Sequence, residues 1–238
     1  MKAQPKPESV STWIISFAGL AVASALMGCA STGYDRSDAA AHSFQSTASE
    51  IQSESLALDT TLAALKDLVN KPAADLKVQF HVYETSLDRL IAASNRAESS
   101  GRVMRARNEA YLQAWDKQLA EMNYEHIRKS SEARKAEVCN QFEAVNKRYE
   151  EMHSALIPLT AYLEDIRKAL SADLTREGLD AVKPIVAKAD ENAARVQTAL
   201  GKLATELTVS GTRLSSVAVQ RAPGPAVQGE VRTEAVTQ

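Results

Sequence analysis

The sequence predicts an all-α protein, an elongated antiparallel helical coiled coil of three or four long helices. Apolar residues between positions 44 and 217 recur at alternating spacings of four and three, the period that places an apolar seam along one side of a helix. The composition agrees, because only 5% of the 238 residues are aromatic and the chain has 9 glycines and 7 prolines. Such a mixture, rich in alanine and leucine, favours long helices over short strands and turns.

The first two predicted helices are separated by Pro72, because proline can begin a helix but cannot continue one. The first helix covers residues 44 to 69. The second follows Pro72, has Asp75 in its first turn, and keeps the apolar rhythm as far as Trp115. Asn108 lies on this second seam, where a buried hydrogen bond could fix the register of the helices.

The third predicted helix carries the most regular seam, and a fourth helix follows it. The third spans residues 127 to 170 and is unbroken from Val138 onward, whereas Arg134 occupies a position where the rhythm requires an apolar residue. Either Arg134 extends its charged end to solvent, or Ala133 takes its place on the seam. The fourth spans residues 179 to 217.

The connection between the second and third helices has two interpretations. Residues 116 to 130 contain no glycine or proline, and only Asn123 is a turn former near their centre. The apolar rhythm loses its phase there, which indicates either a hairpin or a discontinuity within one helix of about 100 residues. We expect the hairpin, and a continuous helix would instead give a three-helix rod.

The first 28 residues have the features of a bacterial lipoprotein signal peptide. Lys2 and Lys6 form a positive leader, an apolar run extends from Trp13 to Gly28, and Gly28 supplies the small residue before Cys29. A retained transmembrane anchor is the alternative, but the run is shorter than the roughly 20 residues that a spanning helix needs. We therefore expect cleavage before Cys29 and lipidation of this cysteine.

Lipid on Cys29 would attach the chain to a membrane of the bacterial cell envelope. Ala30 and Ser31 follow the cysteine with no aspartate beside it, a pattern compatible with the outer membrane and its periplasmic face. The predicted domains are a signal peptide at residues 1 to 28, a lipidated N-terminus and tether at 29 to 43, a coiled-coil helical domain at 44 to 217, and a disordered C-terminal tail at 218 to 238.

The sequence offers no catalytic motif, so we predict that the protein is not an enzyme and has no catalytic, cofactor-binding or metal-binding residue. Glu150 and His153 form one Glu-x-x-His, a pattern that di-iron bundle proteins use twice together with two further glutamates. Met152 occupies the seam between them, which places both at its edge. Cys139, the only unmodified cysteine after processing, is either a solvated or partly packed thiol or half of an intermolecular disulfide.

The charge pattern excludes nucleic acid as an expected partner, because acidic and basic residues are interspersed and the formal net charge is −2. The densest basic patch also contains glutamates. A solvated face therefore explains it better than a site for anionic lipid or cell-wall polymer. The patch consists of Arg128, Lys129, Arg134 and Lys135.

Several motifs resemble those of an uncharacterised bacterial family, domain of unknown function 2959, over roughly residues 40 to 215. They are the lipobox before Cys29, the helix ending Leu62 to Val69, the Trp115 region, Ile127-Arg128-Lys129-Ser130-Ser131, Arg148-Tyr149, and Leu156-Ile157-Pro158-Leu159 before Tyr162-Leu163-Glu164-Asp165. The chain departs from the family pattern at residues 166 to 173. The resemblance implies an exported helical protein of unknown activity and carries over no catalytic residue.

These observations predict a lipid-anchored envelope protein with a structural or protein-interaction role. Its expected partners are the membrane, through the lipid on Cys29, and a protein or a second copy bound through the helices. The alternative is a ligand-binding or metal-binding helical-bundle lipoprotein, which would require polar residues to converge inside the bundle. No small-molecule substrate is evident in the sequence.

Overall fold

The computed structural model describes residues 33 to 216, and these residues form four α-helices and no strand. The all-α prediction is therefore confirmed for this part of the chain. The helices are α1 (Gly33–Asn70), α2 (Leu76–Ala120), α3 (Glu125–Ala172) and α4 (Arg176–Leu214). Cys29, the predicted signal peptide and residues 218 to 238 of the predicted tail lie outside the described residues.

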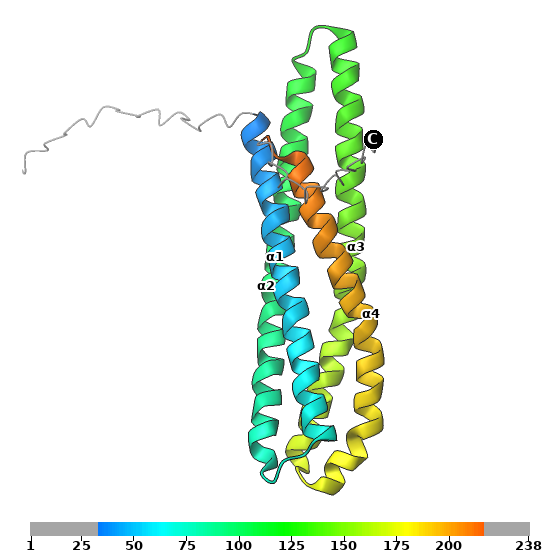
Figure 1. The fold of residues 1–238 in the computed structure, drawn as a ribbon. Coiled ribbons are helices and arrows are strands. Elements are labelled where there is room, and N and C mark those ends of the chain that lie inside the picture. Colours follow the sequence, from blue (N-terminus) through cyan, green and yellow to red (C-terminus); the bar gives the residue numbers. More distant parts are fainter. Residues whose placement is uncertain (1–32, 217–238) are drawn as a thin grey trace, which may run out of the picture. The chain divides into compact units, whose positions relative to one another are not determined.

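The four helices run side by side, and each reverses the direction of the one before it (Figure 1). Helix α1 packs against α2 and α4, and α3 packs against the same two helices, so α1 and α3 lie diagonally opposite. The connections α1–α2 and α3–α4 lie at one end of the bundle. The α2–α3 connection lies at the other end, where α1 begins and α4 finishes (Figure 1).

Capping side chains fix the starts of two helices close to the predicted positions. The Asp75 carboxylate accepts a hydrogen bond from the Lys77 backbone N–H at 3.0 Å, which caps α2. The Thr175 hydroxyl accepts from the Gly178 N–H at 3.1 Å and caps α4. Residues 121 to 124 separate α2 from α3, so the hairpin interpretation is confirmed and the continuous helix is excluded.

Helix α1 begins earlier than the sequence predicts. It starts at Gly33 and not at Phe44, and Ala40 and Ala41 are buried. Residues 33 to 43 therefore belong to the bundle and not to a tether. The apolar spacing did not reveal this segment, because alanine is a weak apolar signal. Small residues fit here because α1 and α4 approach closely. A Cβ added to Gly211 of α4 would lie 2.9 Å from the Ala41 carbonyl oxygen.

The core of the bundle follows the predicted seams most closely in α3. Every buried residue of α3 lies on the seam predicted from Val138 to Leu170, and none of the predicted positions in that range is missing. Pro158 and Pro184 lie inside α3 and α4 without ending either helix. The ten buried positions are Val138, Phe142, Val145, Tyr149, Met152, Leu156, Leu159, Leu163, Ile166 and Leu170.

The predicted seam is wrong over the first turns of α3. Arg134 and its alternative on the seam, Ala133, are both exposed, and Ile127 is 49% exposed. The reason is that α4 ends at Leu214, whose carbonyl oxygen accepts a hydrogen bond from the Ser37 hydroxyl near the start of α1. Beyond that level α4 no longer covers the seam of α3.

Candidate functional site

The most distinctive polar contacts of the bundle join α2 to α3 through two buried tyrosines. The Tyr83 hydroxyl of α2 donates a hydrogen bond to the Leu163 carbonyl oxygen of α3 at 2.6 Å. In the opposite direction, the Tyr149 hydroxyl of α3 donates to the Ala97 carbonyl oxygen of α2 at 3.0 Å. We call these two contacts the tyrosine bridges.

The two bridges share one face of the bundle. Fourteen residues separate Tyr83 from Ala97 on α2, and the same number separates Tyr149 from Leu163 on α3. Fourteen residues are two heptads, which return to the same side of a helix packed in a coiled-coil fashion. The bridges therefore hold α2 and α3 together at two levels, with one aromatic ring between the helices at each.

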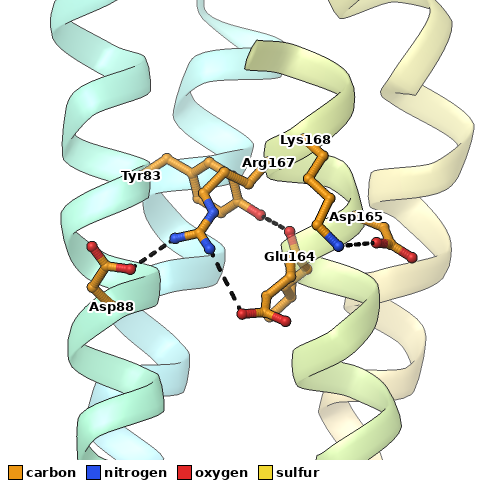
Figure 2. Close-up of polar contacts among 7 residues, drawn as sticks. Tyr83, Asp88, Glu164, Asp165, Arg167 and Lys168 are labelled. Carbon is orange, nitrogen blue, oxygen red and sulfur yellow. Dashed lines mark hydrogen bonds and ion pairs between the residues drawn. The ribbon is translucent and has the colours of Figure 1, made fainter. Parts of the chain in front are cut away.

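Figure 2 shows the Tyr83 bridge and the ion pairs around it. Arg167 of α3 extends across to the Asp88 carboxylate of α2 at 2.7 Å and also contacts Glu164 at 3.6 Å. Burial raises the pKa of the Tyr83 hydroxyl well above its ordinary value, and the nearby Arg167 charge only partly opposes this. Tyr83 stays a neutral hydrogen-bond donor, and the contact is structural.

Space for the Tyr149 ring depends on Gly101 of α2. A Cβ at this position would lie 2.6 Å from Cζ and 2.7 Å from the hydroxyl oxygen of Tyr149, closer than side-chain atoms approach. The Arg105 guanidinium lies 5.2 Å from the centre of the ring, within cation–π range. Burial raises the pKa of Tyr149 to about 12, the Glu54 carboxylate adds to the rise, and Arg105 opposes it.

The Glu-x-x-His pair lies beside this bridge, and both of its side chains contact neighbouring residues of the bundle. Glu150 is exposed and pairs with Arg105 at 3.0 Å, while the His153 ring stacks on Tyr149 with 6.2 Å between centroids. Both lie at the edge of the seam, as the position of Met152 predicts. Among residues 33 to 216, no three histidine, cysteine or acidic side chains gather where they could hold a metal ion.

Glu54 of α1 is the buried charge that the sequence analysis missed. Its side chain is 1% exposed, a hydrogen bond with Ser94 holds it to α2, and its Oε2 atom has no partner. The ion pairs of the described residues do not include it. Burial raises the pKa of the Glu54 carboxyl to about 7, although the Ser94 hydrogen bond acts in the opposite sense.

A wider stripe along α1 could have revealed Glu54. The predicted seam passes from Ile51 to Ser55 and Leu58, and Ser55 is only half-buried. Glu54 lies three residues after Ile51 and four before Leu58, which is an equally good position on the same face. It is buried because α2 lies against this position, where Ser94 makes a hydrogen bond with the Glu54 side chain.

Asn108 is buried at 3% exposure, as its seam position predicts, but its side chain does not make the expected hydrogen bond. Neither Oδ1 nor Nδ2 has a partner within the described residues. The register of the helices is fixed instead by the tyrosine bridges and by packing.

The hollows between the helices are open grooves with charged walls. Arg148 and Glu206 form an ion pair at 3.0 Å in the groove between α3 and α4. The groove between α2 and α3 contains Cys139, which is half-buried and lies 3.6 Å from Glu143. Burial and the Glu143 carboxylate raise the pKa of the Cys139 thiol, which disfavours the reactive thiolate.

The basic patch near the α2–α3 connection is neutralised by its neighbours. Lys129 pairs with Glu125 at 2.7 Å, and Arg134 pairs with Glu137 at 2.8 Å. Lys135 reaches across to Asp116 of α2. These exposed pairs fit the predicted solvated face.

Comparison with known proteins adds no relative. No family model, no curated protein and no solved structure matches the chain. The resemblance to domain of unknown function 2959 stays a prediction from the motifs. Within residues 33 to 216, no helix has an apolar stretch long enough to span a bilayer.

Proposed function

We propose that this protein is a lipid-anchored component of the bacterial cell envelope whose helical bundle has a structural or protein-interaction role and no catalytic activity. One observation supports the absence of a ligand site best: the buried polar groups do not converge. Glu54 is held at Ser94 of α2, and Asn108 lies fourteen residues further along that helix. At 1.5 Å per residue they are about 21 Å apart.

Apolar packing between these levels supports the same proposal. Side chains from all four helices form one buried cluster that runs along the bundle. The cluster includes Phe44 and Phe142, whose rings lie 5.5 Å apart between α1 and α3. A ligand or metal site inside the described bundle would have to displace this packing.

We further propose that the bundle is an elongated antiparallel coiled coil. The four-three spacing of the buried residues in α3 supports it, since this is the spacing of side chains that interlock between supercoiled helices. The 48 residues of α3 correspond to a helix about 72 Å long.

The proposed envelope location depends on the sequence around Cys29. The positive leader, the short apolar run and the small residue before the cysteine support export and lipidation. The absence of an aspartate after Cys29 supports the outer membrane, with the bundle in the periplasm. The lipid would supply the membrane attachment.

Metabolic labelling with a clickable fatty acid tests the anchor. We expect labelled wild-type protein, no label in Cys29→Ser, and wild-type labelling in the matched control Cys139→Ser. Mass spectrometry should place the mature N-terminus at Cys29. Label that persists in Cys29→Ser, or a mature chain that starts at Met1, would contradict the proposal.

Photo-crosslinking in cells tests the interaction role. A crosslinker placed at Leu56, which is 67% exposed on α1, should trap a partner chain or a second copy at a defined mass. The same crosslinker at the buried position Leu58 serves as the control and should give no adduct to another chain. Equal adducts at both positions would indicate non-specific capture.

A further inference from the structure

The α2–α3 hairpin extends past the other two helices at the end of the bundle where α1 begins (Figure 1). A Cβ on Gly33, the first residue of α1, would lie 3.1 Å from the Gln118 side-chain oxygen, so α1 starts beside the last turn of α2. Helix α4 ends at Leu214, which contacts Ser37. We call residues 121 to 128, which lie beyond these levels, the hairpin end.

Only a short chain connects this end of the bundle to the predicted lipid. Three residues separate Cys29 from Gly33, in place of the tether of fifteen residues predicted from the sequence. Four Cα steps of 3.8 Å span at most about 15 Å. Past Gln118 the hairpin has two more helical residues, about 3 Å, and a four-residue loop before it turns back. A lipid on Cys29 would therefore hold the hairpin end close to the bilayer.

The exposed side chains of the hairpin end suit the surface of a phospholipid bilayer. Tyr124 is 70% exposed and Ile127 is 49% exposed, and neither has an apolar partner helix to cover it. Tyrosine prefers the boundary between headgroups and acyl chains, where its ring is apolar and its hydroxyl meets water.

Of the acidic residues near this surface, Glu121 is exposed and forms no ion pair within the described residues, whereas the other two are paired with basic neighbours. Glu125 pairs with Lys129 at 2.7 Å, and Glu132 lies 3.7 Å from Arg128. Their negative charges are compensated within one turn of the helix. The opposite end also has exposed apolar side chains, Val78 at 63% and Val82 at 52% near the start of α2. Its connection between α1 and α2, Lys71 to Asp75, contains no aromatic residue.

We propose that the hairpin end rests on the membrane that holds the Cys29 lipid, with Tyr124 and Ile127 in the headgroup region. This inference depends on the proposed lipidation of Cys29. It assigns the bilayer surface as a second contact of the protein, made by side chains of the bundle itself. Two contacts, one through lipid and one through the hairpin end, would fix which end of the bundle faces the membrane.

Depth-dependent quenching on the acylated full chain tests this contact. Each protein carries Cys139→Ser and one new cysteine labelled with an environment-sensitive dye, either Asn123→Cys at the hairpin end or Ala74→Cys at the opposite end. The proteins are reconstituted in phosphatidylethanolamine and phosphatidylglycerol vesicles that contain a doxyl-labelled lipid. We expect quenching and a blue-shifted emission at position 123 and neither change at position 74.

A second pair of variants tests the side chains that we assign to the contact. Tyr124→Ser with Ile127→Ser should abolish the quenching at position 123. Val103→Ser, at an apolar position on α2 with nearly the same exposure as Ile127, should leave the quenching unchanged. The four substituted positions at the two ends of the bundle are exposed, namely Ala74, Asn123, Tyr124 and Ile127. Circular dichroism melts verify that each variant is folded.

Mass spectrometry of the same samples separates the two hypotheses. A preparation without acyl chains on Cys29 would contradict the proposed function. An acylated protein with equal quenching at positions 123 and 74, or with none at 123, would overturn the membrane contact and leave the lipid anchor intact. Quenching that survives the double serine change would overturn the assignment of Tyr124 and Ile127.

Discussion

At the scale of single residues, the buried carboxyl of Glu54 makes the stability of the bundle depend on pH. The pKa of an unfolded glutamate is near 4.5, whereas burial raises the pKa of Glu54 in the bundle to about 7. Below pH 4.5 both states hold the proton, and Glu54 changes nothing. Between these values the unfolded chain releases the proton while the bundle keeps it, so the free energy of unfolding falls as the pH rises, and above pH 7 the loss is complete.

Glu54→Gln should remove this pH dependence, because an amide of the same size carries no charge to bury. A shift of this size corresponds to about 3 kcal/mol at pH 8 relative to pH 4.5. Urea unfolding at pH 5 and pH 8 measures it, and the variant should be the more stable protein at pH 8. Glu151→Gln, on the exposed side of α3, is the control and should keep the wild-type slope. An unchanged slope in Glu54→Gln would contradict the assignment.

Two helical glycines provide a matched pair of alanine substitutions with opposite expected signs. Gly201 of α4 has nothing within 4 Å of an added Cβ, so Gly201→Ala should stabilise the helix by up to about 1 kcal/mol. Gly101→Ala should destabilise the bundle by roughly 1 to 3 kcal/mol, because the new methyl displaces the Tyr149 ring. Thermal melts of both variants decide the matter. A Gly101→Ala protein as stable as Gly201→Ala would show that Tyr149 moves away without cost.

The predicted seams are wrong in two places, and both errors concern the width of the buried face of a helix. The narrow seam selected Ser55, whereas the structure buries Glu54. At the start of α3 the sequence left either Arg134 or Ala133 on the seam, whereas the structure exposes both. The number of helices that cover a given turn decides this outcome. The apolar spacing within one helix does not show how many neighbours cover each turn. As a result, α1 buries more residues than predicted, and the start of α3, which α4 does not cover, buries fewer.

At the scale of the helices, we expect the tyrosine bridges between α2 and α3 to contribute to the free energy of unfolding. Tyr83→Phe and Tyr149→Phe should each cost about 1 kcal/mol of unfolding free energy, because each removes one buried hydrogen bond and keeps the ring. Tyr162→Phe is the matched control, since its hydroxyl makes an exposed contact of 3.3 Å to Ile185. Chemical denaturation measures all three, and equal losses in all three would argue against a special role for the bridges.

The seam of α3 should be the region most sensitive to charge. Leu163→Asp should destabilise the bundle by roughly 3 kcal/mol or more, because Leu163 is fully buried and the new carboxylate has no partner. Glu150→Ala with His153→Ala should cost little, since the first is exposed and the second lies at the edge.

Thermal melts with and without added metal extend this comparison. If a divalent metal raised the melting temperature of the wild type but not that of the double alanine variant, the Glu-x-x-His would bind metal after all. The same conclusion would follow if the double variant lost as much stability as Leu163→Asp.

Most helix boundaries could be predicted because they depend on local chemistry. Pro72 and the Asp75 cap separate α1 from α2, and the Thr175 cap starts α4. The start of α1 could not be predicted, because alanines and serines before Phe44 look neutral in isolation. They become core residues only when α4 lies against them, which is a tertiary contact.

At the scale of the whole helical unit, small-angle scattering tests the proposed elongated coiled coil. A compact domain of about 180 residues has a radius of gyration near 16 Å. A bundle as long as α3 should instead give about 22 Å for residues 33 to 216. A value near 16 Å would require the helices to fold into a compact bundle and would favour the ligand-binding alternative.

The tyrosine bridges could be found only from the assembled bundle, because each contact joins different helices. Tyr149 was predicted as a seam residue, but its partner Ala97 and the space at Gly101 lie about fifty residues away on α2. Cys29, by contrast, depends on a contiguous motif and is a prediction from sequence alone.

The contact between Ser37 and Leu214 has a consequence for the order in which the chain becomes a protein. These residues lie 177 positions apart, and α1 is made first while its partner α4 is made last. Synthesis and any export from the N-terminus therefore leave one apolar side of α1 in water until the final helix arrives. A chain interrupted before residue 176 would keep that side exposed, so proteases and chaperones could recognise incomplete copies by the face that α4 normally covers.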